Sequence, residues 1–164
     1  MPLTPDQLAV LRQDIAADPA FADLVHNQDG AQVVADAYNA LAMPTVIVWR
    51  TSLPPEDYTG AQSIVWTAVD QLQIGKARIF EWMSGMLTRP LNLADPNVRQ
   101  GIADAFGVAS ATRTNLFTLG TRPATRGEAL FATGPGTAQA PATMSHEGDI
   151  TSDDVMWCWW GPGA

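Results

Sequence analysis

One local pattern recurs along this chain and constrains its fold most: a helix-start signal followed by only a few turns of apolar spacing. Thr4 and Gln7 have the spacing of a capping box, and Thr125 and Glu128 repeat it. Further start signals lie at Asp18-Pro19, Asp95-Pro96, Ser110 or Thr112, and Thr151-Ser152-Asp153-Asp154. Because the sequence has no sustained heptad pattern and no internal repeat, we expect seven or eight short helices.

Apolar residues at helical spacing follow most of these signals. The first quarter of the chain predicts three short helices, with a break at Asp29-Gly30 before the third, whose apolar positions run from Val33 to Leu41. The longest helical pattern covers residues 61–87 and is interrupted at Gly75.

Residues 45–50 are the clearest strand candidate, because they are β-branched and apolar and lie between prolines. A strand requires a partner, and the sequence leaves three open. These are the stretch from Ala142 to Ser145, the region near Ile150, and a strand of another subunit.

The segment 133–149 holds three Gly and two Pro among small polar residues, which is typical of a linker or an extended arm. The expected fold class is therefore mainly α: a bundle of short helices with one or two short strands and an extended Gly/Pro-rich C-terminal arm. We assign residues 1–132 to a helical domain and residues 133–164 to the arm with its Trp-rich end, both within one single-domain subunit.

Charge excludes one class of function. A formal net charge of -8 and a pI near 4.4 argue against sequence-specific nucleic-acid binding, which depends on Lys and Arg neutralising phosphates. The first 36 residues carry six aspartates and only Arg12, and this face either meets a basic partner or is simply solvated. With no basic start followed by an apolar run and no segment of about 18 apolar residues, we expect a soluble, unsecreted protein without membrane contact.

Residues suited to catalysis are scattered. Cys158 is the single cysteine and lies among tryptophans with no neighbouring His or Lys to lower its pKa. His26 and His146 lack metal-binding spacing, so each is expected to be an ordinary surface or hydrogen-bonded histidine. We therefore expect no cofactor, no metal site and no enzymatic activity.

The most informative local feature is the run Trp157-Cys158-Trp159-Trp160, because large aromatic side chains are costly to leave in water. Two interpretations are open. The arm folds back and completes its own core, or Trp157, Trp159 and Trp160 dock on a neighbouring subunit, which the Gly- and Pro-rich approach favours. On the second interpretation, truncation after Gly148 weakens assembly and leaves the helical domain folded.

A second candidate contact consists of Arg113, Arg122 and Arg126, with Arg89 and Arg99 as further members after folding. Such a patch would meet the acidic face of another copy. Scattered solubilising arginines explain the same residues equally well.

Several strings in this sequence are similar to a known family. They are Val48-Trp49-Arg50-Thr51, the run from Ile64 to Trp82, Asn97-Val98-Arg99-Gln100-Gly101, Arg122-Pro123-Ala124-Thr125, the run from Glu128 to Gly134, and an ending near Glu147-Gly148-Asp149-Ile150. In order and spacing they resemble a family of small tailed-bacteriophage proteins. The segment from Trp157 to Ala164 departs from that pattern.

The resemblance implies virion morphogenesis, with assembly in the host cytoplasm. Proteins of this size and helical character resemble head–tail connector or adaptor subunits, which form rings below the portal. The implied partners are other copies in a ring, the portal, and tail or neck proteins, with DNA passing through a channel without being read. Two alternatives stay open: a head-decoration or tail-associated virion protein, and a small phage enzyme or host-directed regulator.

Overall fold

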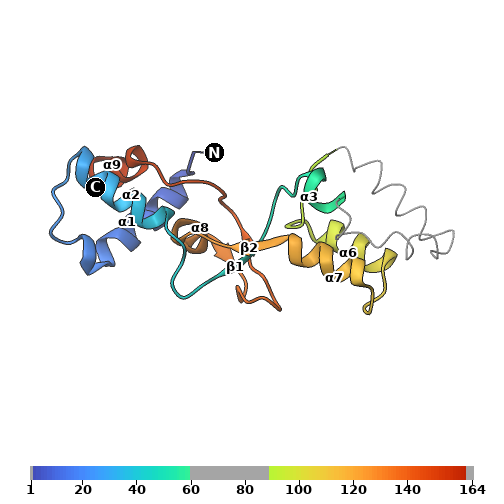
Figure 1. Ribbon diagram of the computed structural model, residues 1–164. Helices are drawn as coiled ribbons and strands as arrows, with labels where there is room; N and C mark the ends of the chain where they lie inside the picture. The colour runs from blue at the N-terminus through green and yellow to red at the C-terminus, as the bar shows by residue number, and fades with distance from the viewer. Residues whose placement is uncertain (1, 60–88, 162–164) are drawn as a thin grey trace. The chain divides into compact units, whose positions relative to one another are not determined.

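The computed structural model describes residues 2–59 and 89–161 (Figure 1). These residues form seven α-helices, one 3-10 turn and two small two-stranded sheets. The predicted mainly α fold class is therefore confirmed. The helical pattern predicted over residues 61–87, and with it the run from Ile64 to Trp82, falls outside the described residues.

The chain divides into two compact units, each of which we describe by itself. Unit 1 combines residues 1–47 with residues 123–164, and unit 2 is the continuous stretch 48–122. This division differs from the predicted boundary at residue 132. The reason is that the C-terminal segment packs against the N-terminal helices, whereas the described residues of unit 2 form a second core.

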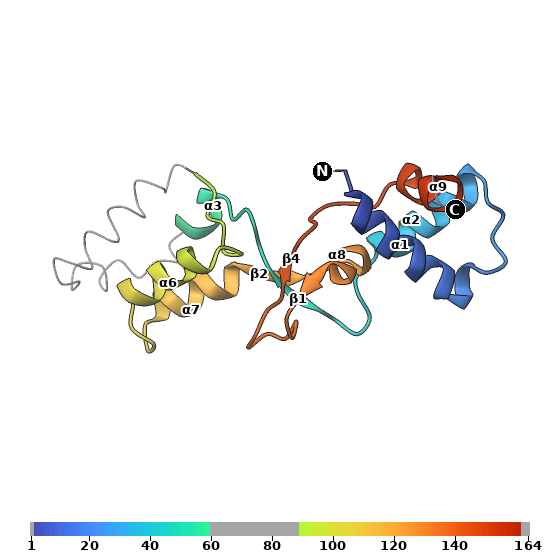
Figure 2. The same ribbon diagram turned by 180° about the vertical axis from the view of Figure 1, so that it is seen from behind.

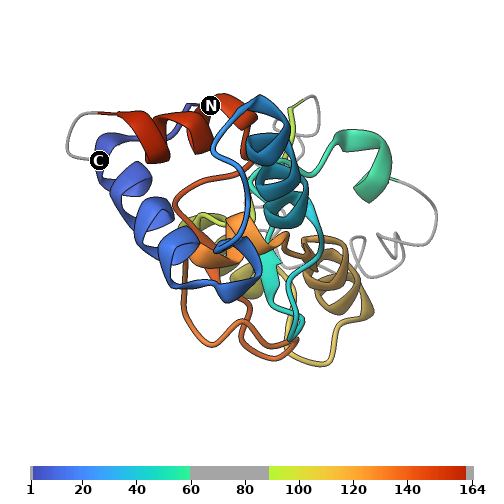
Figure 3. The ribbon, with the colours of Figure 1, turned by 90° about the vertical axis from the view of Figure 1, so that its left-hand side faces the viewer.

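Unit 1 is built from helices at both ends of its sequence, seen in Figures 1 and 3. Its elements are α1 (Pro5–Ala17), the 3-10 turn η1 (Pro19–Phe21), α2 (Gln28–Asn39), α8 (Arg126–Leu130), β3 (Ala132–Thr133), β4 (Thr143–Met144) and α9 (Ser152–Trp160). Helix α9 lies beside both α1 and α2. The Trp-rich end is thus part of a packed helix.

Capping signals set the helix starts in unit 1 as predicted. Thr4 begins α1 with a complete capping box to Gln7, and Thr125 begins α8 with one to Glu128. Thr151 caps α9, and its partner in the box is Asp154 in place of the usual Glu or Gln. Each box satisfies backbone donors that the first helical turn leaves without partners.

The predicted break at Asp29-Gly30 is wrong. Asn27 caps α2, its side-chain oxygen accepts a hydrogen bond from the Gly30 amide at 2.9 Å, and the helix runs through both residues. Gly30 is there for space: a Cβ at this position would lie 2.1 Å from the carbonyl oxygen of Val25. The small residue allows the preceding loop to pack against the first turn of α2.

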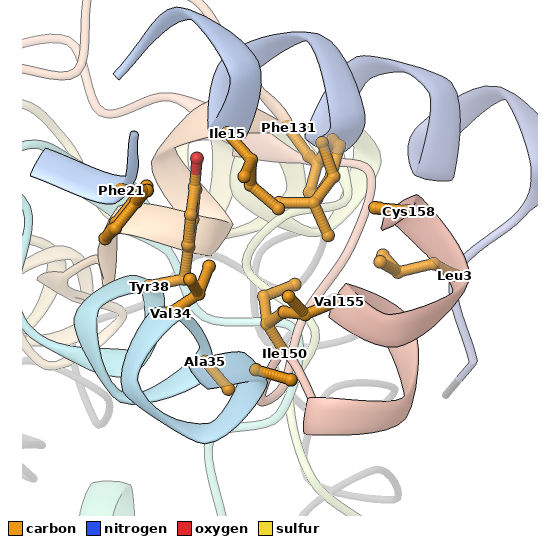
Figure 4. Close-up of a cluster of buried hydrophobic side chains, with 12 residues drawn as sticks. Leu3, Ile15, Phe21, Val34, Ala35, Tyr38, Phe131, Ile150, Val155 and Cys158 are labelled. Atoms are coloured by element: carbon orange, nitrogen blue, oxygen red, sulfur yellow. The ribbon is translucent and has the colours of Figure 1, made fainter. Parts of the chain in front are cut away.

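The core of unit 1 unites three helices that are distant in sequence. Figure 4 shows Ile15 of α1, Val34 of α2 and Val155 of α9 converging, and all three are buried. Phe21 and Tyr38 lie side by side with ring centroids 6.0 Å apart. Burial of a large apolar side chain contributes about 1.5–3 kcal/mol, so α9 contributes to the stability of the same core as α1 and α2.

The strand expected within residues 45–50 is present as β1 (Ile47–Trp49), and it pairs with β2 (Thr121–Pro123). This partner was not among the three that the sequence left open. The stretch near Ala142 does contact β1, because the amide of Ala142 donates to the carbonyl oxygen of Ile47 at 2.9 Å. The division between the two units runs through β1 and β2.

The Gly- and Pro-rich segment 133–149 carries little regular structure, in line with its composition. At its start, β3 pairs antiparallel with β4, so that Ala132 lies opposite Met144 and Thr133 opposite Thr143. Gly136 has a φ of +67°, and a Cβ there would lie 2.8 Å from Val46 Cγ1, so glycine is required twice over. The Ile47 amide donates to the Gly136 carbonyl oxygen at 2.8 Å, and the Ala142 amide donates to the Ile47 carbonyl oxygen at 2.9 Å, so the segment is held against Ile47.

Unit 2 contains α3 (Pro55–Thr59), α6 (Pro96–Ala105) and α7 (Ala111–Leu119), with α6 beside α7 in Figures 1 and 2. Asp95 caps α6 as predicted, accepting from the Asn97 amide. Among the residues described, no helix is long and apolar enough to cross a membrane.

Candidate contact site around the C-terminal helix

Helix α9 places its three tryptophans differently. Val155 and Cys158, three residues apart, face the core and are buried. Trp157 and Trp159 flank this buried stripe and are half-buried, whereas 65% of Trp160 is exposed. Docking of all three tryptophans on a neighbour stays a prediction: Trp157 and Trp159 are partly covered within their own subunit, and Trp160 is the most exposed of the three.

Trp157 is held by Arg12 of α1. The guanidinium carbon lies 5.2 Å from the centre of a Trp157 ring, within cation–π range. The same guanidinium donates a hydrogen bond of 3.4 Å to the Trp157 carbonyl oxygen, near the C-terminal end of α9. A cation at that end also complements the helix dipole.

Trp159 stacks on His26, with ring centroids 4.4 Å apart and planes inclined by 12°. The Trp160 ring lies nearly perpendicular to the same imidazole, with the two ring centroids 6.0 Å apart. Val25, next to His26 in the chain, is 70% exposed. The loop before α2 and the end of α9 thus form one surface, defined here as the Trp160 surface: Val25, His26 and Trp160.

Cys158 is buried, and its thiol donates a long hydrogen bond of 3.5 Å to the carbonyl oxygen of Leu8. Burial raises the pKa of this thiol to about 11, and Arg12 offsets only part of that effect. Since the thiolate is the reactive form, Cys158 is a packing residue at neutral pH.

Arg126, a predicted inter-subunit contact, is engaged inside unit 1. Its guanidinium forms ion pairs with Asp18 at 2.7 Å and Asp14 at 3.0 Å. It also lies over the ring of Tyr38, 4.4 Å from the centroid, and the Tyr38 hydroxyl donates to Asp14. Arg126 therefore neutralises two carboxylates of its own subunit, and its contact with the acidic face of another copy stays a prediction.

Protonation equilibria in this cluster reflect the close packing. Burial, and then the hydrogen bond to Asp14, raise the pKa of Tyr38 well above its usual value. Burial opposes the charge on Arg126, but hydrogen bonds to Asp18 and Asp14 outweigh it and raise the pKa. The Ala20 amide and Arg126 lower the pKa of Asp18. The cluster is accordingly an ionised structural joint between α1, η1, α2 and α8.

Arg113 and Arg122 belong to unit 2. The Arg113 guanidinium lies 5.4 Å from the centre of the Phe117 ring on the same helix, and Arg122 lies in β2. Arg99, considered a further member of the patch, donates to the carbonyl oxygens of Leu93 and Ala94 at 2.6 and 2.9 Å and covers Trp49. Arg99 therefore stabilises the start of α6.

A second apolar surface follows the end of α2. Leu41 and Met43, just after α2, are 64% and 88% exposed and border a cavity of about 410 Å³. The sequence pattern counted Val33 and Leu41 among the apolar positions of the third helix, but both are exposed, and its buried residues include Val34 and Tyr38. We call the residues Leu41, Met43 and Val46 the Met43 surface. Helical periodicity alone gave no signal for it, because α2 ends at Asn39.

His146 also differs from expectation, since it is neither on the surface nor hydrogen-bonded. It is 98% buried, with its ring edge-on to Phe131 at 5.7 Å. Neither imidazole nitrogen has a hydrogen-bond partner within the part of the chain that the structure describes. In that same part no group of three or more His, Cys, Asp or Glu residues is placed to hold a metal ion.

Comparison with known proteins adds no relative to this picture. No protein-family model, no curated protein and no solved structure matches the chain.

Proposed function

We propose that this chain is a structural subunit of a tailed-phage particle, a head–tail connector that forms a ring below the portal. The assignment to a tailed-phage particle rests on the sequence resemblance. The ring is inferred from the two different apolar surfaces that unit 1 exposes, the Trp160 surface and the Met43 surface. Isolated exposed apolar residues are ordinary, but two clusters of large ones on one small unit favour protein contacts.

The two surfaces are suited to a head-to-tail arrangement. The Trp160 surface includes the loop before α2, and the Met43 surface follows the end of α2. Twelve helical residues at about 1.5 Å each separate the two ends of α2 by about 18 Å. A ring of identical subunits uses two distinct patches in each subunit, and unit 1 exposes two. In the proposed ring, Trp160 of one copy occupies the groove beside Met43 of the next.

Charge supports the same proposal. Unit 1 contains eleven carboxylates and two arginines, a formal net charge of -9. A negative channel wall repels DNA phosphates and lets a genome slide past without binding. In the proposed ring the subunit connects head to tail and seals the passage, with the portal and the tail or neck proteins as its other partners.

Native mass spectrometry of the purified chain tests the ring directly. We expect a closed oligomer that Trp160→Glu and Met43→Glu each convert to a folded monomer. Val108→Glu, at an 83% exposed position in unit 2, is the matched control and should leave the oligomer intact. A wild-type protein that stays monomeric at every concentration tested contradicts the ring.

Labelling of intact particles separates the alternatives. Copies around the portal axis support the connector, whereas copies on the capsid or along the tail indicate a decoration or tail-associated protein. A chain present in infected cells and missing from particles would indicate a small phage enzyme or a host-directed regulator.

A further inference from the structure

A cavity in unit 1 lies between α1, the segment around η1 and α9, apart from the Met43 surface. Its volume is about 280 Å³. Ile15, Phe21 and Cys158 supply apolar lining, and the stacked pair His26 and Trp159 lines it as well. Two small residues, Ala16 and Ala22, complete the lining with Arg12. This size is slightly below the about 300–1,000 Å³ of typical small-molecule sites, so it suits a small ligand.

The charge of this lining is opposite to that of the unit around it. Unit 1 carries eleven carboxylates, but none of the eight lining residues is acidic. Two of the eight, Arg12 and His26, are basic. Arg12 therefore places a positive charge in the lining of a cavity on a strongly negative unit.

Arg12 has unused capacity to bind an anion. The other arginine of the unit, Arg126, holds two carboxylates, whereas Arg12 forms no ion pair with any residue that the structure describes. Its contacts are the Trp157 ring and one long hydrogen bond of 3.4 Å to the Trp157 carbonyl oxygen. Its Nε is buried with no acceptor among the described residues. A half-buried guanidinium with five donors and one weak acceptor favours a planar carboxylate.

We propose that this cavity binds a small organic monoanion: a carboxylate attached to an aromatic or branched apolar body. The carboxylate accepts hydrogen bonds from Arg12, and the apolar body packs against Phe21, Ile15 and Trp159. A net charge of -9 on the unit disfavours polyanions such as nucleotides, because one guanidinium cannot offset the repulsion of several phosphate charges. The proposal stands apart from the phage function, since the monomer contains the whole site.

Phenylacetate is the probe, and 2-phenylethanol and 2-phenylethylamine are its neutral and cationic counterparts. In an amide-resolved NMR titration of the full chain, phenylacetate should shift the signals of Ala22, His26 and the Trp159 indole. The neutral alcohol should bind at least about tenfold more weakly, as expected for loss of a charge-assisted hydrogen bond. Equal affinity for the acid and the alcohol would overturn the proposal.

Substitutions at Arg12 test whether its guanidinium is the group that binds the carboxylate. Arg12→Met keeps an apolar stem and should weaken phenylacetate binding at least about tenfold, whereas Arg12→Lys should retain part of it. Arg113→Met, a charge removal of the same kind in unit 2, should leave the affinity unchanged. Full binding to a folded Arg12→Met protein would contradict the assignment.

A second pair of variants tests the cavity even if Arg12→Met fails to fold. Ala22→Phe places a ring at the exposed edge of the cavity and should abolish binding by filling it. Ala20→Phe adds the same ring at an exposed position of η1 that does not line the cavity, and it should bind phenylacetate normally. Binding that survives Ala22→Phe would place the ligand elsewhere and reject the site.

Discussion

Unit 1 and unit 2 form their hydrophobic cores from differently arranged parts of the chain. Unit 2 uses one continuous stretch of chain, and its core draws on α6, α7 and the leucines of the loops beside them. Unit 1 is assembled from both ends of the sequence, so α9 must meet α1 and α2 across more than a hundred residues. Their charges differ as sharply: unit 1 has a formal net charge of -9, and unit 2, with seven basic and six acidic residues, has +1.

The difference shows where each unit is vulnerable. A core closed by the last helix of the chain depends on that helix, and the carboxylates of unit 1 repel one another wherever no arginine lies between them. The Arg126 joint relieves this repulsion for Asp14 and Asp18. Unit 2 has no comparable dependence on the chain ends.

Truncation after Gly148 should have the largest effect. It removes Ile150, Val155 and Cys158 from the core, together with all of α9, and should cost more than about 5 kcal/mol. In amide NMR spectra, unit 1 signals should collapse while those of unit 2 stay dispersed. Truncation after Gly161, which keeps α9, is the control. A folded unit 1 without α9 would restore the interpretation of the C-terminus as a free arm.

Core substitutions of matched type should separate the two units. Leu11→Ala in unit 1 and Ile102→Ala in unit 2 each remove a fully buried aliphatic side chain and should cost about 2–5 kcal/mol. Native-state hydrogen exchange should show the loss confined to the unit that carries the substitution. Equal losses in both units from either variant would mean that the chain unfolds as one cooperative whole.

These residues also show how much the sequence could predict. The capping boxes at Thr4 and Thr125 were predictable because all their atoms lie within four residues. The partner of β1 and the neighbours of α9 were not, because they depend on contacts between distant segments. Exposure of Leu41 was missed for a local reason: the helix ends two residues earlier, so its periodicity no longer applies.

The candidate contact residues likewise divide into properties that the sequence could predict and partners that it could not. The sequence identified Trp157, Trp159 and Trp160 as residues that need burial, which is a property of their side chains. It could not tell that Arg12 and His26 would cover two of them. Likewise Arg126 was chosen for its charge, but its partners Asp14 and Asp18 lie more than a hundred residues away.

Loss of the Arg126 joint should have an intermediate effect. Arg126→Gln leaves two carboxylates and the Tyr38 hydroxyl without their cation and should destabilise unit 1 by about 1–3 kcal/mol. The midpoint of urea unfolding, followed by unit 1 amides, measures this loss. Arg113→Gln, whose guanidinium lies over an aromatic ring in unit 2, should change stability by less than about 0.5 kcal/mol. Similar costs for the two variants would remove the special role of the joint.

Alkaline pH should produce the most specific difference between the two units. The pKa of Cys158 rises from 9.0 to about 11 on folding, so the unfolded thiol ionises first and stability falls between pH 9 and pH 11. The loss from this thiol is at most about 3 kcal/mol. In unit 2, burial raises the pKa of Tyr58 from 10.0, so its decline should begin about one pH unit later. Urea midpoints from pH 8 to pH 11 test the order, and Cys158→Ala should remove the early step in unit 1.

Hydrogen exchange in α9 of the wild-type monomer tests the central claim most directly, because that claim is that the Trp-rich helix closes the core of its own subunit. The amides of α9 should exchange with the same opening free energy as those of Val34 and Tyr38 in α2, at every protein concentration. Fast exchange of α9 in dilute protein, with protection that appears only as the concentration rises, would show that the helix is ordered by a neighbour and would contradict the account.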